Sequence, residues 1–166
     1  VALIFQKPSL RTRVSFEAGM TQMGGHAIYL GPTDISIGKR ETTEDIALVL
    51  SRYVNIIMAR VFGHDIVVDL AKHATVPVIN GLSDQGHPCQ ILADLLTFEE
   101  HRGPVAGKTF AWVGDGNNVC SSFIHAAPKL GFKLNIACPA VYHPDLVDLA
   151  RAEEQQGRVS MTDDPR

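Results

Sequence analysis

A group of hydroxyl and guanidinium side chains near the start of the chain could bind an anion. Ser9, Arg11, Thr12 and Arg13 follow the apolar residues 1–5, and apolar side chains then recur at helical spacing. The first turn of a helix exposes backbone N–H groups and the positive end of its dipole, and arginines there are unfavourable for the helix alone. These residues therefore indicate one of two features: a phosphate or carboxylate site, or a helix that Ser9 caps with solvated arginines beside it.

Two further candidates follow expected strands, at the edge where parallel sheets bind their ligands. Arg60 closes an apolar strand, where a solvated surface Arg is the common case. Beside a phosphate loop, the same residue becomes a second arm of an anion clamp. Asn117 and Asn118 end a turn, 114–118, and one of them is expected to cap the next helix. That turn begins Gly-x-Gly but carries Val119 at the third glycine position, which makes it a poor dinucleotide-binding fingerprint.

His87, Pro88, Cys89 and Gln90 open a long helical pattern. A neutral imidazole can donate one hydrogen bond to a carbonyl oxygen, and the Gln amide can recognise an NH2 group through its own carbonyl. Cys89 lies where a helix N-terminus can activate a thiol. No His or Asp stands at a spacing that pairs with this thiol, so we expect no nucleophilic role for it.

Two of these motifs resemble those of a known family. The segment Ser9–Glu17 is similar to the carbamoyl-phosphate loop of the transcarbamylases, in which Thr is commoner at the position of Leu10. The tetrapeptide His87–Gln90, with residues 91–97 after it, resembles the His-Pro-x-Gln element of the ornithine branch more than that of the aspartate branch. The resemblance runs over essentially the whole chain.

The resemblance implies a role for each candidate residue. The implied carbamoyl-phosphate ligands are Ser9, Leu10, Arg11, Thr12, Ser36, Arg60, His87, Pro88, Cys89 and Gln90. The implied catalytic residues among them are Arg11, Thr12, Arg60, His87 and Gln90. Thr12, Arg60 and His87 direct donors at the carbonyl oxygen, and Gln90 orients the carbamoyl nitrogen. Asn118 binds the α-groups of ornithine.

A polar loop, 35–41, resembles a family loop that reaches into the site of a neighbouring subunit. The resemblance to the family as a whole implies a homotrimer. Ser36 stands where the family often has Gln. Two basic residues of this loop, Lys39 and Arg40, are read as solvated.

The implied reaction transfers the carbamoyl group of carbamoyl phosphate to the δ-amine of L-ornithine, giving L-citrulline and phosphate in arginine metabolism and amino-acid biosynthesis. It needs no metal and no organic cofactor. One alternative is a carbamoyltransferase for another amine, either aspartate or a modified ornithine. Another is a nucleotide-binding doubly wound protein. The strand near Ile136 is not followed by the acid that would bind a ribose, which also counts against this class. A third is that these 166 residues bind carbamoyl phosphate without catalysis, and we expect the isolated segment to be inactive.

The composition is typical of a soluble cytoplasmic domain. The net charge of −3 supports neither a nucleic acid nor a membrane as partner. The three cysteines are widely spaced, which favours a reducing compartment over disulfides or a zinc site. The chain opens inside an apolar run without an initiator Met, and we expect it to be a segment of a longer protein.

Alternating strand and helix patterns position all of these residues. Strands are expected at 1–5, 26–30, 56–61, 76–82, 109–113, 133–137 and 158–161. Helices are expected at 11–23, 42–53, 66–74, 88–103, 118–130 and 144–156. Such alternation predicts an α/β fold with two doubly wound parallel-sheet domains, the second incomplete, and helices on both sheet faces. The expected division is a carbamoyl-phosphate domain at 1–86, an interdomain helix at 87–103 and a partial amino-acid domain at 104–166.

Overall fold

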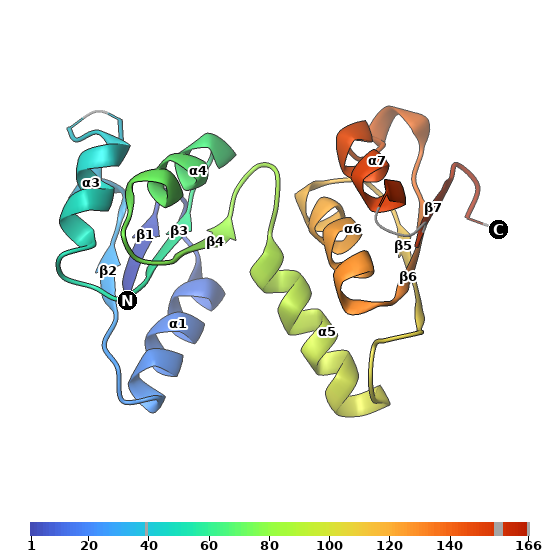
Figure 1. Ribbon diagram of the computed structural model, residues 1–166, viewed down its shortest axis with the longest axis horizontal. Coiled ribbons are helices and arrows are strands. Elements are labelled where there is room, and N and C mark those ends of the chain that lie inside the picture. Colours follow the sequence, from blue (N-terminus) through green and yellow to red (C-terminus); the bar gives the residue numbers. More distant parts are fainter. Residues whose placement is uncertain (39, 155–157, 166) are drawn as a thin grey trace. The chain divides into compact units, whose positions relative to one another are not determined.

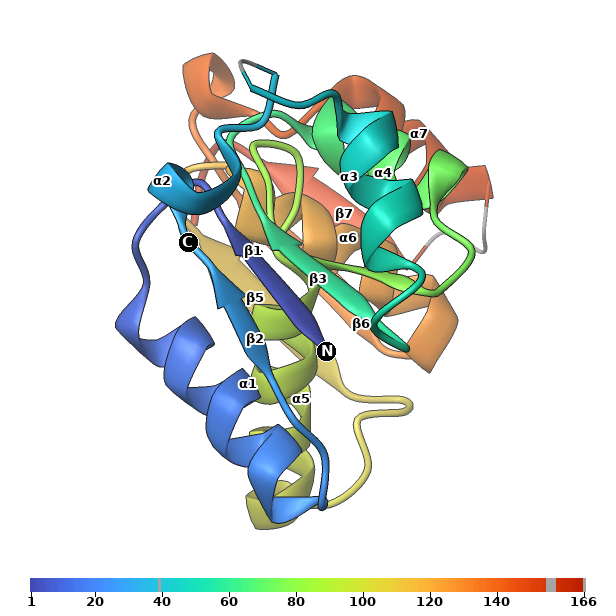
Figure 2. The ribbon, with the colours of Figure 1, turned by 90° about the vertical axis from the view of Figure 1, so that its left-hand side faces the viewer.

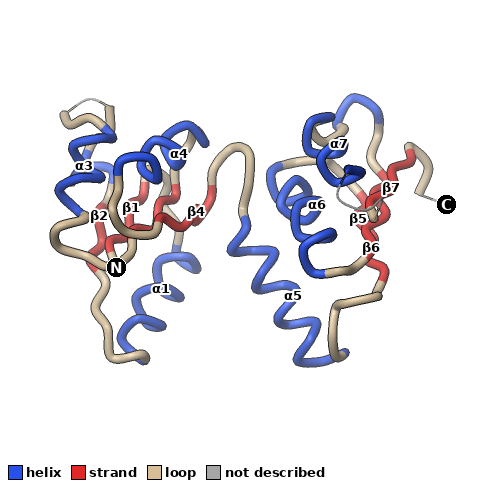
Figure 3. The backbone as a smooth tube through the Cα atoms, viewed as in Figure 1, coloured by secondary structure: helices blue, strands red, loops and turns tan. Residues whose placement is uncertain are grey.

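The computed structural model describes residues 1–38, 40–154 and 158–165. The chain forms two compact units, Val1–Asp84 and Gln85–Arg166. Each unit alternates helices with parallel strands, as Figure 1 and Figure 3 show.

The first unit is built on a four-stranded parallel sheet. Its strands are β1 (Ala2–Phe5), β2 (Ile28–Leu30), β3 (Ile57–Arg60) and β4 (Val78–Leu82), in the spatial order β2-β1-β3-β4. Its helices are α1 (Leu10–Gln22), α2 (Pro32–Ile35), α3 (Thr43–Leu50) and α4 (His64–His73). Figure 2 shows α1 on one side of the sheet and α3 and α4 on the other. Helices therefore cover both faces of this sheet, as its sequence pattern predicts.

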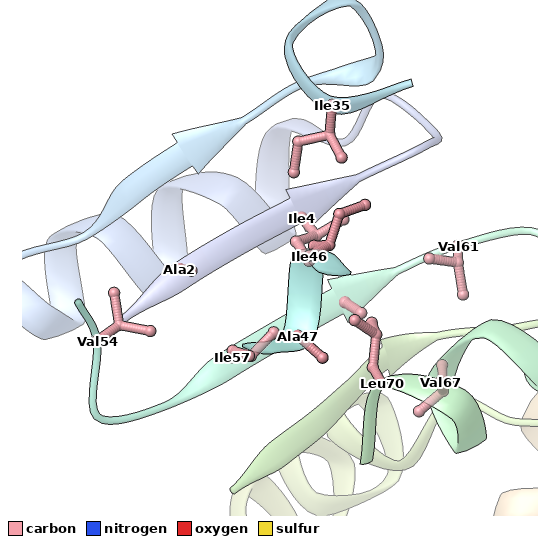
Figure 4. Close-up of a cluster of buried hydrophobic side chains, with 11 residues drawn as sticks. Ala2, Ile4, Ile35, Ile46, Ala47, Val54, Ile57, Val61, Val67 and Leu70 are labelled. Carbon is pink, nitrogen blue, oxygen red and sulfur yellow. The ribbon is translucent and has the colours of Figure 1, made fainter. Parts of the chain in front are cut away.

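Alternation along the strands divides the first core between these two faces. Side chains at alternate strand positions point to opposite faces of a sheet. Ile4 packs with Ile46 of α3 and Leu70 of α4 in the larger cluster, which Figure 4 shows. Met58 belongs to the smaller cluster, with Phe16 of α1 packed against it. Arg60 follows Met58 by two positions and therefore lies on the α1 face of the sheet.

The second unit contains a three-stranded parallel sheet. Its strands are β5 (Thr109–Val113), β6 (Lys133–Ala137) and β7 (Val159–Thr162), in the order β5-β6-β7. Its helices are α5 (Pro88–Arg102), α6 (Asn118–Leu130), the 3-10 helix η1 (Ala140–Tyr142) and α7 (Leu146–Glu154).

One face of this second sheet carries the core. Phe110 of β5 makes edge-on contacts with Phe98 of α5, Phe123 of α6 and Phe132. Residues of α5 and α6 are buried in the same cluster. The alternate positions of β5, which point to the other face, are exposed. The helices that contribute to this cluster therefore pack on one face of the second sheet, in a domain that the sequence predicts to be incomplete.

The α/β fold class with two parallel sheets is confirmed, with local differences. Between the strand expected at 26–30 and the helix expected at 42–53, the structure has the short helix α2, because Pro32 suits a first helical turn and the Asp34 side chain accepts a hydrogen bond from the Gly31 N–H at 2.7 Å. The expected helix at 144–156 is observed as Leu146–Glu154, and its last two positions, 155 and 156, lie outside the described residues. None of the described helices is long and apolar enough to cross a membrane.

Candidate functional site

The N-terminus of α1 lies at the carboxyl end of β1, where the sequence places an anion site. Ser9 is the N-cap residue, with extended backbone angles of φ −156° and ψ 118°, and its hydroxyl oxygen accepts a hydrogen bond from the Thr12 N–H at 3.4 Å. The hydroxyl proton of Ser9 is not used in this bond, so Ser9 can cap the helix and also donate to a ligand. The first turn contains no acidic side chain that would neutralise the end of the helix.

Arg60, at the carboxyl end of β3, joins this helix start. Its Nη1 donates to the Thr12 hydroxyl oxygen at 3.4 Å, although 48 residues separate the two in the chain. Its Nε is buried and has no hydrogen-bond partner among the described residues. Burial, and then the nearby charge of Arg11, lower the pKa of Arg60 from its ordinary value. The structure thus brings Arg11, Thr12 and Arg60 together.

This cluster holds the positive charges of Arg11 and Arg60. Among the residues that the structure describes, no carboxylate forms an ion pair with Arg11 or Arg60. Arg11 is exposed and Arg60 is partly buried, with its Nε buried. Partial burial of a cation without a charged partner is unfavourable, and a bound anion with several acceptor oxygens would relieve that cost. We call Ser9, Leu10, Arg11, Thr12 and Arg60 the anion clamp.

Arg13 lies outside the anion clamp, although its sequence position suggests the same role as Arg11. Its Nε donates to Glu17 at 2.9 Å, one turn along α1. Its guanidinium also stacks over the ring of Tyr29 in β2, 3.8 Å from the ring centroid. Arg13 therefore connects α1 to the edge of the sheet.

Ser36 lies after α2 and makes its contacts locally. Its backbone is in the left-handed region, with φ 48° and ψ 55°, and its hydroxyl donates to the Pro32 carbonyl at 3.2 Å. It lines a cavity of about 260 Å³ at the carboxyl ends of β1 and β2, together with Gln6 and Phe62. The structure does not join Ser36 to the anion clamp by any described hydrogen bond. In the same loop Arg40 is exposed, as expected, and Lys39 lies outside the described residues.

In the second unit, one buried hydroxyl connects the starts of two helices. His87 is the N-cap residue of α5, and its N–H donates to Oγ of Ser122 at 2.8 Å. The Ser122 hydroxyl in turn donates to the carbonyl of Asn118, the first residue of α6, at 3.2 Å. Ser122 thereby holds together two segments that carry candidate residues. Ser122 is not among the residues predicted from the sequence, although a pair of serines inside an apolar helical pattern is a visible signal.

Replacing Ser122 by Ala is expected to lower the free energy of unfolding by about 1 kcal/mol, because the partly buried His87 N–H loses its acceptor. Urea denaturation of the full-length protein measures this change. Ser121→Ala is the matched control, because Ser121 is an adjacent buried serine for which no side-chain hydrogen bond is described. Equal losses in the two variants would show that the Ser122 bridge contributes nothing of its own.

Cys89 lies at the start of α5, where a reactive thiolate had to be considered. Burial is the main influence on this side chain and raises the pKa of its thiol above the ordinary value, while a backbone hydrogen bond acts in the opposite direction. At neutral pH the thiol therefore keeps its proton. This is unfavourable for a nucleophile.

Accordingly, Cys89→Ala is expected to change kcat by less than about threefold, since a protonated thiol can supply at most one weak contact. Steady-state assays of the full-length protein measure kcat for this variant and for wild type. Iodoacetamide should also react slowly with Cys89 at pH 7, and faster at higher pH as the thiol ionises. An inactive Cys89→Ala variant would contradict this assignment.

The turn between β5 and α6 is packed too closely to bind a dinucleotide as a glycine-rich loop does. Asn117 caps α6, accepting from the N–H groups of Val119 at 3.0 Å and Cys120 at 3.3 Å. Gly116 donates its N–H to the Tyr142 carbonyl at 2.9 Å, and a Cβ at this position would collide with Pro144. The glycine therefore allows the turn to pack against the segment after β6, not against a pyrophosphate. Asn117 is the capping residue, which leaves Asn118 as the ligand candidate of this turn.

Within residues 1–38, 40–154 and 158–165, no three His, Cys, Asp or Glu side chains are grouped so that they could hold a metal ion.

Two family models match this chain, and together they account for nearly all of it. The model described as "Aspartate/ornithine carbamoyltransferase, carbamoyl-P binding domain" matches residues 1–100. The model described as "Aspartate/ornithine carbamoyltransferase, Asp/Orn binding domain" matches residues 106–166.

The chain belongs to the aspartate/ornithine carbamoyltransferase family.

Relatives in this family share both sequence and fold with the chain. An ornithine carbamoyltransferase of Caulobacter vibrioides is 64% identical over 166 residues, which are 100% of this chain and 53% of that protein. The solved ornithine carbamoyltransferase of Pyrococcus furiosus matches with a TM-score of 0.91 and 52% identity, over 96% of this chain and 52% of the other. That of Thermus thermophilus matches with a TM-score of 0.88 and 51% identity, over 99% and 55%. The chain therefore spans about half the length of the carbamoyltransferases it matches.

The carbamoyl-phosphate domain of the family model extends further than the first compact unit of the structure. The match to the family model runs to residue 100, most of the way along α5, whereas the first compact unit ends at Asp84. In the structure, Ile91 and Leu95 of α5 are buried in the core of the second unit. Helix α5 is thus assigned to the first domain by family resemblance and to the second unit by packing.

Proposed function

We propose that the full-length protein is an ornithine carbamoyltransferase, which transfers the carbamoyl group of carbamoyl phosphate to the δ-amine of L-ornithine and releases L-citrulline and phosphate. One observation carries this proposal: Arg60 bonded to Thr12, beside Arg11, at the start of a helix without an acidic first turn. The pair of family models and the names of the relatives support it.

The anion clamp is proposed to bind the phosphate. Helix N–H groups, including that of Leu10, and the Ser9 hydroxyl supply donors, and Arg11 and Arg60 supply charge. Thr12 and Arg60 are proposed to direct further donors at the carbonyl oxygen. Negative charge grows there as the amine attacks, and donors that are already in place stabilise it without reorganisation.

Residues at the start of α5 are proposed to bind the carbamoyl group, and a residue at the start of α6 is proposed to bind the amino acid. His87 donates to the carbonyl oxygen and Gln90 accepts from the carbamoyl nitrogen, while Pro88 and Cys89 provide the helix turn between them. Asn118 is proposed to bind the α-groups of ornithine. Alignment of two bound substrates lowers the barrier further, because it removes most of the entropic cost of their encounter.

We propose a homotrimer in the cytoplasm, in which the loop after α2 brings Ser36 to the carbamoyl phosphate of a neighbouring subunit. The loop of residues 35–41 resembles the family segment with this role, and the short Ser36 side chain would reach less far than the Gln that is common there. The isolated 166 residues are proposed to be inactive, since they make up about half of a typical relative.

Product analysis of the full-length protein tests the proposal. With carbamoyl phosphate and ornithine we expect citrulline, at a rate that rises with pH as the δ-amine loses its proton. With aspartate in place of ornithine we expect no carbamoyl-aspartate. Carbamoyl-aspartate alone would preserve the role of the anion clamp and overturn that of Asn118.

A titration with NAD tests the remaining class of function. We expect no binding, because the turn at Gly116 is covered by the segment that contains Tyr142 and Pro144. Saturable NAD binding without citrulline formation would favour a nucleotide-binding protein instead.

A further inference from the structure

The amide of Gln90 has a partner that determines which way it points. Gln90 lies in the first turn of α5, and Asp94 follows one turn later on the same face of the helix. Nε2 of Gln90 donates to Oδ1 of Asp94 at 2.9 Å. Both side chains are exposed in this chain, so the contact is not forced by packing.

The chemistry of this contact removes the usual ambiguity of an amide side chain. The nitrogen and oxygen of a Gln amide have nearly the same shape, and only their hydrogen bonds distinguish the two orientations. An ionised carboxylate can only accept, so the reversed amide would set two acceptor oxygens against each other. Asp94 therefore selects the orientation in which Gln90 Oε1 points away from it, as an acceptor. The negative charge of Asp94 also polarises the amide and strengthens that acceptor.

We propose that Asp94 is a positioning residue for the recognition of the carbamoyl donor. It holds the NH2 of Gln90 and so presents Oε1 to the NH2 group of carbamoyl phosphate. This inference rests on the proposed function and adds to it a residue that acts only through Gln90. Its consequence is selectivity between two acyl phosphates of the same shape, one with an amino group and one with a methyl group.

Carbamoyl phosphate and acetyl phosphate differ in this one group. An oriented acceptor forms a hydrogen bond with the amino group of the first, whereas it faces a methyl group in the second and stays unpaired. Sites that hydrogen-bond a substrate group reject an analogue that lacks the group, because their own polar atoms then lose a partner. Loss of Asp94 lets the amide rotate and so removes part of this discrimination.

The test compares Asp94→Leu and Asp94→Asn with wild type in the full-length protein. It measures KM for carbamoyl phosphate and the constant for competitive inhibition by acetyl phosphate. We expect Asp94→Leu to raise KM about threefold to tenfold, the equivalent of one hydrogen bond, with acetyl phosphate inhibition unchanged. Asp94→Asn should lose less, because its carbonyl can still accept from Gln90. Glu100→Gln removes an exposed charge from the same helix and is the matched control.

A double-mutant cycle with Gln90→Leu shows whether Asp94 acts through Gln90. If it does, adding Asp94→Leu to Gln90→Leu changes KM no further. The inference is overturned if Asp94→Leu leaves KM unchanged, if both constants shift by the same factor as in a general structural defect, or if the effect persists without Gln90. A wild-type protein that forms no citrulline overturns the proposed function, and this inference with it.

Discussion

Replacing Arg60 by Met is expected to lower kcat/KM for carbamoyl phosphate by about 10²–10³, the usual loss when a preplaced donor to the reacting group is removed. Arg60 contributes a charge and a forked donor at the carboxyl end of β3, beside the Thr12 hydroxyl. Methionine keeps much of the aliphatic stem and removes only the guanidinium. Both KM and kcat should be affected, since the same group binds the phosphate and stabilises the charge that develops.

The same variant should not lose stability, which separates this effect from misfolding. In the absence of ligand, Arg60 holds a buried Nε without a partner and lies near the like charge of Arg11. Removing an uncompensated charge relieves desolvation and repulsion, so Tm of the unliganded protein should stay level or rise.

Steady-state kinetics and thermal denaturation of the full-length protein measure the two effects of Arg60→Met. Arg13→Met is the matched control, because it removes the same charge from a residue that is already bonded to Glu17 and stacked on Tyr29. Its effect on kcat/KM should be far smaller. An Arg60→Met variant with wild-type kinetics, or with a loss no larger than that of Arg13→Met, would contradict the anion clamp.

Replacing His87 by Ala is expected to lower kcat by about 10²–10³, with a much smaller change in KM for carbamoyl phosphate. The helix start should survive, because its link to Ser122 uses the His87 backbone N–H and not the imidazole. The lost group is therefore the donor proposed to stabilise the carbonyl oxygen as negative charge develops, while the phosphate ligands remain.

Single-turnover and steady-state assays of His87→Ala separate this effect on chemistry from one on binding. His87→Gln keeps a side-chain donor and should recover part of the rate, which a purely structural role for His87 does not predict. Equal rates for His87→Ala and wild type would remove His87 from the catalytic residues.

The larger features of the first unit could be predicted from local patterns. The apolar run at β1, the helical spacing after Ser9 and the polar end of β3 each indicate an element boundary. Parallel pairing of β1 and β3 then places Phe5 opposite Arg60, at one edge of the sheet. Because consecutive strand residues face opposite sides, Arg60 shares a face with α1. Once β1 and β3 are known to be neighbours, the alternation of side chains between the two sheet faces is enough to place Arg60 close to Thr12.

Contacts that depend on the order of elements in space could not be predicted in this way. The helix alone pairs Arg13, but not Arg11, with an acidic residue four positions later, whereas the stacking of Arg13 required the position of Tyr29 in β2. The role of Ser122 required the packing of α6 against the start of α5. The contact between Gln90 and Asp94 is different, since it spans four residues of one helix and could have been read from the sequence.

The position of a bound phosphonate tests the anion clamp most directly. The experiment is a crystal structure of the full-length protein with phosphonoacetamide, which replaces the bridging anhydride oxygen of carbamoyl phosphate with a methylene group. We expect phosphonate oxygens within hydrogen-bond distance of the Arg60 guanidinium, the Thr12 hydroxyl and the first N–H groups of α1. A phosphonate bound elsewhere, with Arg60 and Thr12 still bonded only to each other, would contradict the assignment of the clamp and the function proposed from it.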